Sequence, residues 1–437
     1  METLTEAEKI TNEVYRDFID CIDPSMEKEF NSKHRNPVEW EGQGPWLIDV
    51  AGNRFLDAAT AGGVFGLGYR HPKVIEAVTR QLQRMPCSSR AALNPLQAKL
   101  ARRLSEVTPE GLQYSHIAAS GTESIEIALK VARLTTGRHE VVSTLGSFHG
   151  LALAATCVGG IPYLHDGVRP LVPGIHHVPY GKIEDMEKSI SDKTCAVVLE
   201  PVQTAPGVIV PPDGYLKRIR ELCDQHGALL IMDEIQTALR TGHFLACSHE
   251  GVVPDIACLG KVFSGGVMPV GIAIWNKRVQ DAVNKKPFFN STTFGGNQLT
   301  CAAVLAVLDI VEQEHLLDHI RKQGAKLRAH LDRLAQTFPK IYRLVEGRGM
   351  MQAVELADIK LVAAASQRLV RKHRLLVLHA VFNLQRMRIN PPLNIEDPEL
   401  NRIMEIIEDV TVELNTMDPA LLQKVFDNWR QGIQEDF

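Results

Sequence analysis

The chain has 437 residues, of which 45% are hydrophobic and 23% are charged, and its formal net charge is −4 at pH 7. This length exceeds what one simple core accommodates, so we expect two or three lobes. A slightly acidic chain offers no basic footprint for DNA or RNA, which excludes nucleic acid as the expected partner.

The cysteines and the first residues of the chain indicate the cellular compartment in which we expect the protein. The eight cysteines are scattered, without a CxxC pair or a His/Cys cluster at zinc spacing, so we expect reduced thiols, no metal site and a cytoplasmic location. The first nine residues are acidic and typical of a helix, so we expect neither a secretory nor an organellar signal. Apolar runs stay far below the roughly 18 residues that span a bilayer, so no membrane partner is expected.

Three parts of the chain differ in character. Residues 1–60 precede a central block over residues 61–310, in which short apolar runs at 196–199, 228–232 and 270–274 alternate with helical stretches. Strands that are apolar on both faces and separated by helices indicate an α/β fold with a parallel-rich sheet covered on both sides.

The part over residues 311–437 is typical of a smaller α+β lobe. It contains candidate strands at residues 351–356, 375–378 and 387–389. A helix is predicted to begin with Asp397 as its N-cap and Pro398 in its first turn. A last helix, opened by Asp418 and Pro419, carries an apolar stripe that is typical of a core or an interface rather than of a ligand site: Leu422, Val425, Phe426, Trp429 and Ile433.

Residues Ser120 to Glu123 form a capping-box pattern in front of a helical apolar face. A helix N-terminus offers free N–H groups and a positive dipole end, and Gly121 lets a phosphate approach the backbone. Most capping boxes only cap a helix, so this pattern indicates a phosphate site only in combination with the two that follow.

Asp233 ends an apolar strand, where burying a carboxylate is costly unless a partner pairs with it. A protonated pyridine nitrogen is such a partner. The charge-assisted hydrogen bond keeps the pyridine ring protonated, so that the ring can withdraw electrons. Gln236 is within reach of a phenolic oxygen on that ring, and Ile235 can pack on the ring face. The alternative is a strand-end aspartate that caps the next element.

Lys261 follows another buried strand and lies beside a glycine-rich loop. The P-loop pattern is excluded, because Asp255 stands where it requires glycine and Val262 where it requires Ser or Thr. A GxGxxG fingerprint after a strand is also absent. Partial burial lowers the pKa of such an amine and leaves it nucleophilic. The amine, the carboxylate and the helix start together indicate pyridoxal 5'-phosphate (PLP).

The order and spacing of the motifs resemble the class III aminotransferases (ω-amino acid, ornithine and diamine type) of the fold-type I PLP-dependent family, with the greatest likeness to the diamine branch. The likeness covers nearly the whole chain, in segments 46–53, 121–130, 148–150, 200–203, 233–237, 265–269, 292–297 and 388–393. It implies a large domain with a mostly parallel seven-stranded sheet covered by helices. It also implies a small α+β domain built from both chain ends.

The resemblance implies roles around the cofactor ring. Lys261 corresponds to the lysine that joins the cofactor covalently and then moves the proton between the substrate carbon and the cofactor. Asp233 corresponds to the residue that holds the pyridinium and Gln236 to the one that holds the phenolic oxygen. Ile235 and Phe148 would sandwich the ring.

The resemblance also implies how phosphate and substrate are held. Gly121 and Thr122 would bind the phosphate of their own subunit, and Thr293 is similar to the threonine that reaches the phosphate of the neighbouring subunit. The expected unit is therefore a homodimer with two shared active sites. Arg388 resembles the arginine that receives the carboxylate of the oxo-acid or amino-acid substrate.

Departures from the family pattern fall around the substrate. Leu151 stands where relatives have Arg or Lys, so a second carboxylate clamp is missing. The family's Gln-Gly-Glu-Gly segment reads Gln203-Thr-Ala-Pro206, with Ala205 at the position of the glutamate that shields the arginine. We expect Arg388 to be open to an anion, or paired with a different group.

These features predict a PLP-dependent aminotransferase that acts between a primary amine, or its aldehyde, and an oxo-acid/amino-acid pair such as 2-oxoglutarate/glutamate or pyruvate/alanine. Three alternatives stay open at this point. They are a 1,2-aminomutase of an amino aldehyde, an ornithine or acetylornithine type ω-aminotransferase, and a non-catalytic binding protein on the same fold.

Overall fold

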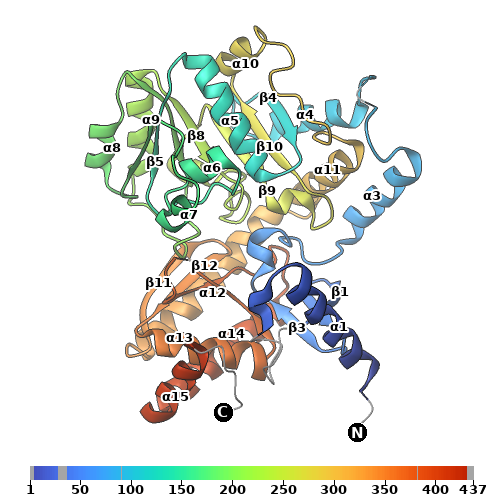
Figure 1. Ribbon diagram of the computed structural model, residues 1–437, viewed down its shortest axis with the longest axis vertical. Coiled ribbons are helices and arrows are strands. Elements are labelled where there is room, and N and C mark those ends of the chain that lie inside the picture. The colour runs from blue at the N-terminus through green and yellow to red at the C-terminus, as the bar shows by residue number, and fades with distance from the viewer. Residues whose placement is uncertain (1–3, 28–36, 90, 381, 431–437) are drawn as a thin grey trace.

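The computed structural model describes residues 4–27, 37–89, 91–380 and 382–430, which form two lobes (Figure 1). The upper lobe holds a seven-stranded sheet with its helices. The lower lobe combines α1 and β1 to β3 from the N-terminal part with the elements from α12 to α15.

The seven-stranded sheet has the order β4-β10-β9-β8-β7-β5-β6. β10 runs antiparallel to both of its neighbours, and the other pairs are parallel. This confirms the predicted mostly parallel seven-stranded sheet. The strands are β4 (Tyr114–Ala118), β5 (Glu140–Thr144), β6 (Ile175–Val178), β7 (Thr194–Leu199), β8 (Leu229–Asp233), β9 (Ile256–Gly260) and β10 (Gly271–Trp275).

Side chains alternate between the two faces of each strand, and helices bury both faces of this sheet. Leu229 and Ile231 of β8 pack in one apolar cluster with α5, whereas Leu230 and Met232 pack in another that includes α9. The helices of this lobe are α3 (Pro72–Arg84), α4 (Pro95–Val107), α5 (Gly121–Thr136), α6 (Leu153–Val158), α7 (Pro162–Asp166), α8 (Ile183–Ser189), α9 (Tyr215–His226), α10 (Lys277–Val283) and α11 (Gln298–Gln313).

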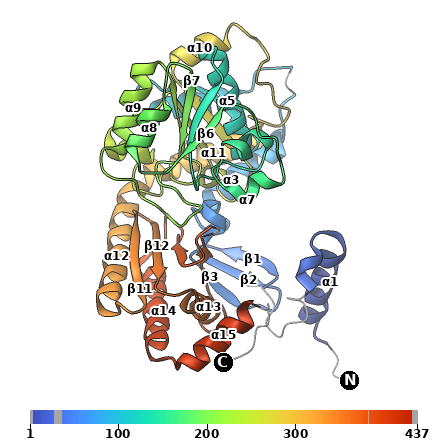
Figure 2. The same cartoon turned by 60° about the vertical axis from the view of Figure 1, so that its left-hand side comes forward.

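The lower lobe contains two four-stranded sheets (Figure 2). The first is β1 (Glu39–Gln43), β2 (Trp46–Asp49), β3 (Arg54–Asp57) and β13 (Leu375–Leu376). The parallel pairing of β13 with β3 brings both parts of the chain into one sheet. The second sheet has the order β11 (Tyr342–Arg348), β12 (Met351–Leu356), β15 (Arg386–Ile389) and β14 (Leu378–His379).

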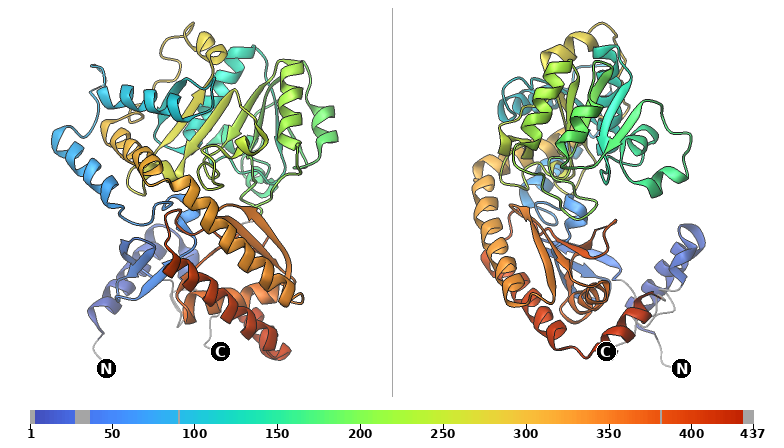
Figure 3. Two further views of the ribbon diagram at one scale, coloured as in Figure 1. Left: turned by 180° about the vertical axis from the view of Figure 1, so that it is seen from behind. Right: turned by 90° about the vertical axis from the view of Figure 1, so that its left-hand side faces the viewer.

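Helices enclose these sheets, and α12 runs along one side of the lobe (Figure 3). The helices are α1 (Glu6–Cys21), α12 (Leu316–Thr337), α13 (Ile359–Gln367), α14 (Asp397–Thr416) and α15 (Pro419–Arg430). α15 packs on α13 and buries Val425 of the predicted apolar stripe; Ile433 lies outside the described residues. Short helical turns are Pro24–Met26, Thr60–Gly63, Ala246–Glu250, Lys261–Ser264 and Arg368–Lys372.

Two predicted elements differ in detail. The strand predicted over residues 375–378 is split into β13 and β14, because its two halves pair with strands of different sheets. Glu396 occupies the N-cap position of α14, and Asp397 is its first helical residue. The Asp397 carboxylate instead accepts hydrogen bonds from Gln323 (3.2 Å) and Lys326 (2.9 Å) on α12.

All eight cysteines are free. Within the described ranges, no helix has both the length and the apolar character needed to cross a membrane.

Candidate active site

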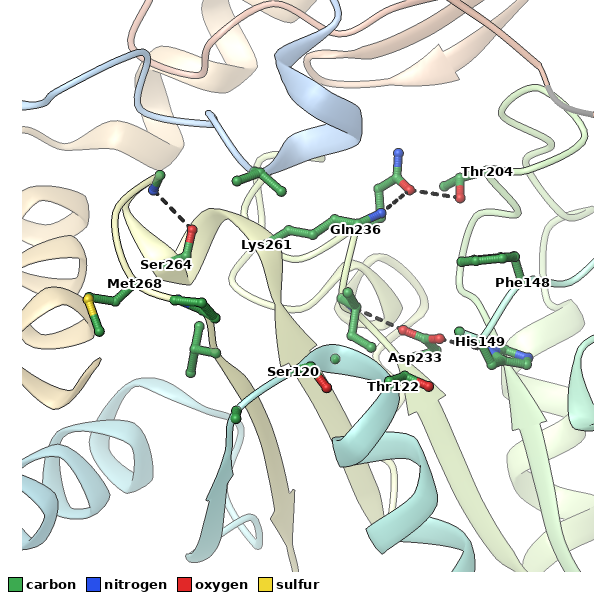
Figure 4. Close-up of a pocket in the computed structure, with 18 of the residues that line it drawn as sticks. Ser120, Thr122, Phe148, His149, Thr204, Asp233, Gln236, Lys261, Ser264 and Met268 are labelled. Atoms are coloured by element: carbon green, nitrogen blue, oxygen red, sulfur yellow. Dashed lines mark hydrogen bonds and ion pairs between the residues drawn. The ribbon is translucent and has the colours of Figure 1, made fainter. Parts of the chain in front are cut away.

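Three chain segments converge at one edge of the large sheet. β4, β8 and β9 are mutually parallel, since β10 is antiparallel to both β4 and β9 and β8 is parallel to β9. Their carboxyl ends therefore meet at the same edge, where ligands bind in open α/β sheets. The segments after them border a cavity of about 460 Å³ (Figure 4). Its lining includes Ser120, Gly121, Thr122, Phe148, His149, Glu200, Thr204, Asp233, Ile235, Gln236, Lys261, Met268 and Pro269.

One end of the cavity is the N-terminus of α5. The Ser120 hydroxyl caps the helix by accepting a hydrogen bond from the Glu123 N–H at 3.3 Å. The Glu123 carboxylate accepts from the Ala119 N–H at 2.8 Å, one residue before the cap. The Glu123 carboxylate therefore bonds to the residue before the N-cap, whereas the predicted capping box places this bond on the N-cap residue itself. The Thr122 hydroxyl oxygen accepts from the Ala152 N–H at 3.2 Å, which leaves its proton available for an anion at this end.

A buried carboxylate stands next to this helix end. Asp233 is 4% exposed, and its two oxygens accept from the Ile235 N–H at 3.0 Å and from Nδ1 of the buried His149 at 2.7 Å. Burial lowers the pKa of His149, but the Asp233 hydrogen bond and the charges of Asp233 and Glu200 outweigh burial, and the net pKa is raised.

Lys261 follows β9 directly and is half-buried. Its φ of +46° places it in the left-handed region, which is rare for a residue other than glycine and concentrates at functional sites. Its Nζ donates to Oε1 of Gln236 at 2.6 Å. Burial lowers the pKa of Lys261 to about 8, while Asp233 acts in the opposite direction.

The structure adds Thr204 to the cavity, a residue that sequence reasoning missed. Its hydroxyl lies 3.0 Å from Oε1 of Gln236 and 3.0 Å from Oε2 of Glu200. Glu200 is buried, and burial raises its pKa. The hydrogen bonds that its carboxylate accepts act in the opposite direction but do not outweigh burial. Figure 4 shows Lys261 and Thr204 meeting Gln236 from opposite sides. The one available signal was that Thr204 occupies the first glycine of the family's Gln-Gly-Glu-Gly segment.

Four predicted residues do not line the cavity of their own chain. Leu151 is 67% exposed, Thr293 is exposed, and Ala205 is buried. Arg388 is also buried, and its Nη1 donates to the Thr204 carbonyl oxygen at 3.3 Å. Within the described part of the chain, no carboxylate forms an ion pair with Arg388, and its buried Nε lacks a partner. Burial lowers the pKa of Arg388, with Glu200 acting in the opposite direction.

The donor set fits PLP on grounds independent of any bound group. The cavity has a helix N-terminus at one side, a carboxylate bonded to an imidazole, and an amine with a lowered pKa. In the described structure, Nε2 of Gln236 is buried without a hydrogen-bond partner, and such a group is costly unless a ligand pairs with it. The chemistry of these groups matches a ring nitrogen, an aldehyde and a phosphate.

Fold and site together define a PLP-dependent aminotransferase of fold type I. The family model described as aminotransferase class III matches residues 30–411, and the chain belongs to this family. It is 40% identical over 393 residues to a putrescine aminotransferase of Pectobacterium atrosepticum, an alignment that covers 87% of this chain and 84% of the relative.

Solved structures give the same result. The ornithine aminotransferase from Toxoplasma gondii superposes with a TM-score of 0.84 at 29% identity, covering 95% of this chain and 99% of that one. A PLP-bound amine transaminase from an uncultivated Pseudomonas species has a TM-score of 0.79 at 29% identity, covering 87% of this chain and 95% of that one.

Proposed function

We propose that this protein transfers an amino group between a primary, terminal amine, or its aldehyde, and an oxo-acid/amino-acid pair such as 2-oxoglutarate/glutamate or pyruvate/alanine. It acts in the cytoplasm as a homodimer with two shared active sites. The observation that carries the proposal is the Lys261 amine, with a pKa lowered to about 8, in a cavity that it shares with Asp233 and the start of α5.

PLP, when bound, supplies an aldehyde that condenses with amines and a ring that withdraws electrons from the adjacent carbon. Gly121 and Thr122 would hold its phosphate, and Asp233 would pair with its ring nitrogen. Gln236 would bind the phenolic oxygen through its unpartnered amide nitrogen, and Ile235 and Phe148 would cover the ring faces.

Lys261 acts twice in this scheme. Its amine would hold the cofactor covalently until a substrate amine takes its place. Once free, Nζ accepts the proton from the amine-bearing carbon and returns a proton later, as a general base and then a general acid. A pKa near 8 suits both roles, because both protonation states are populated near neutral pH.

The residues at the substrate positions of the family pattern bear on the substrate class. Leu151 and Ala205 carry no charge at these positions, which favours an amine or aldehyde without a carboxylate. Arg388, not paired with a carboxylate among the described residues, would grip the oxo-acid bidentately. The 40% identity to a putrescine aminotransferase supports a diamine-like donor.

The attachment residue is tested by borohydride reduction of the purified enzyme followed by peptide mass mapping. We expect the reduced cofactor on Lys261, and a label on another lysine would contradict the proposal. Lys261→Ala should lower turnover by about 10²- to 10⁴-fold.

The substrate class is tested by screening diamines, ω-amino acids and aliphatic aldehydes with either oxo-acid. We expect carboxylate-free amines to be preferred, and equal turnover of ornithine would count against this preference. An aminomutase would convert its substrate without any oxo-acid, whereas a transaminase stops after one half-reaction.

A further inference from the structure

Thr204 connects the groups of the site that lie on different segments. Its N–H (3.2 Å) and hydroxyl (3.0 Å) both contact Oε2 of Glu200. The same hydroxyl lies 3.0 Å from Oε1 of Gln236, which accepts from Lys261 at 2.6 Å. Its carbonyl oxygen accepts from Arg388 at 3.3 Å. A glycine, as in the family's motif, makes only the backbone contacts.

A hydroxyl has one proton and cannot donate to two acceptors at once. When Glu200 is ionised, Thr204 donates to it, and Oε1 of Gln236 remains for the Lys261 ammonium alone. When Glu200 is protonated, it donates to Thr204, and Thr204 then donates to Gln236. In that second arrangement Oε1 of Gln236 already accepts a hydrogen bond from Thr204, so it stabilises a charged Lys261 less.

We propose that Thr204 is a positioning residue that passes the protonation state of Glu200 through Gln236 to the nitrogen of Lys261. The inference rests on the proposed function, because it takes Lys261 as the lysine that binds the cofactor. An ionised Glu200 favours a proton on Lys261 both directly through space and through the orientation of the Thr204 hydroxyl. Only the second effect requires Thr204.

The test is a double-mutant cycle on the purified, cofactor-loaded enzyme. The visible band of the lysine-bound cofactor follows the proton on the Lys261 nitrogen, and its midpoint is read from absorbance against pH. Glu200→Gln lowers this midpoint by about one pH unit. In the Thr204→Val background the same substitution gives a clearly smaller shift, whereas Thr204→Ser retains the full shift.

Controls separate this effect from lost packing. Thr411→Val removes another buried hydroxyl, bonded to Tyr342 at 2.6 Å in the lower lobe, and leaves the coupling intact. Thr204→Val retains the carbonyl oxygen that contacts Arg388, so the substitution removes only the hydrogen bonds of the hydroxyl.

An equal shift in the wild-type and Thr204→Val backgrounds would overturn the inference, as would a Thr204→Ser variant that behaves like Thr204→Val. If Glu200→Gln does not fold, the two Thr204 variants decide: valine and serine substitutions with the same midpoint contradict the proposal. Borohydride labelling away from Lys261 would instead contradict the proposed function itself.

Discussion

Lys261 combines two unusual properties at the scale of a single residue. Its backbone lies in the left-handed region, and its amine is half-buried beside Gln236. Burial disfavours the charged form of an amine, which is why the pKa of Lys261 falls from 10.5 to about 8. At pH 7 this raises the neutral, nucleophilic fraction from about 0.03% to about 10%.

The first prediction follows from this neutral fraction. The rate at which cofactor-free enzyme takes up PLP rises with pH, because only the unprotonated amine attacks the aldehyde, and it levels off above a midpoint near pH 8. Stopped-flow absorbance at 0.5-unit steps (about a threefold change in proton concentration each) measures the profile. Lys261→Ala is the control and shows no such phase. A midpoint near that of an ordinary lysine would contradict the assigned environment.

The same residue scale shows what the sequence could and could not predict about the site. Asp233, Lys261 and Gly121 each stand where an apolar strand ends or a helix starts, and local patterns mark such places. Thr204 carries no local pattern, because its role depends on the distance between its hydroxyl and Gln236 on a different loop.

At the scale of elements, the strands were predictable because burial on both faces leaves long apolar runs. Which strands pair with each other was less predictable. The split between β13 and β14 arises because Leu375 pairs with Leu56 whereas Leu378 pairs with Arg388. Sequence periodicity does not encode which of two sheets a short strand joins, since that choice depends on contacts made with distant parts of the chain.

The second prediction concerns the loop that packs on the start of α5. Gly150 has φ +115°, and an added Cβ would lie 2.3 Å from Oγ1 of Thr122. Gly150→Ala must therefore move this loop, and with it Phe148, away from the start of α5, where we propose that the phosphate binds. We expect PLP to bind at least about tenfold more weakly, as measured by fluorescence titration.

Gly137 at the other end of α5 provides the matched control. Its φ is +69°, but an added Cβ meets nothing within 4 Å. Gly137→Ala therefore carries the backbone strain of about 1–2 kcal/mol without a collision at the cavity. It should lower the melting temperature and leave PLP affinity unchanged. Equal loss of affinity in both variants would show that strain, rather than contact with Thr122, weakens binding.

At the scale of the whole molecule, Arg386 of β15 ties the lower lobe to the loop that carries Thr204. It pairs with Glu346 and Glu355 at 2.8 Å each and donates to the Gly207 carbonyl at 3.1 Å. Glu346 also accepts from the Val210 N–H at 2.9 Å. The cavity loop is thus held by a largely buried ion-pair network in the second lobe.

The third prediction is that Arg386→Met lowers the free energy of unfolding by about 3 kcal/mol, because Glu346 and Glu355, both largely buried, lose the guanidinium that pairs with them. Urea unfolding at fixed protein concentration measures the loss. Arg343 contacts the same Glu355 at 3.4 Å from a side chain that is 57% exposed, so Arg343→Met should cost less than about 1 kcal/mol. Equal losses would mean that burial does not decide the strength of these pairs.

The fourth prediction addresses the proposed shared sites. Thr293 is exposed in its own chain and does not line the cavity of that chain. This placement is expected of a residue that contacts the phosphate in the partner's active site. Lys261→Ala and Thr293→Ala subunits should each be impaired alone. Mixing them forms dimers in which one site combines an intact Lys261 with an intact Thr293 from the partner, while the other site carries both lesions. Activity after unfolding and refolding the mixture should exceed that of either parent treated alone. If each site is built from one chain, every site in the mixture carries one lesion or the other, and no gain appears.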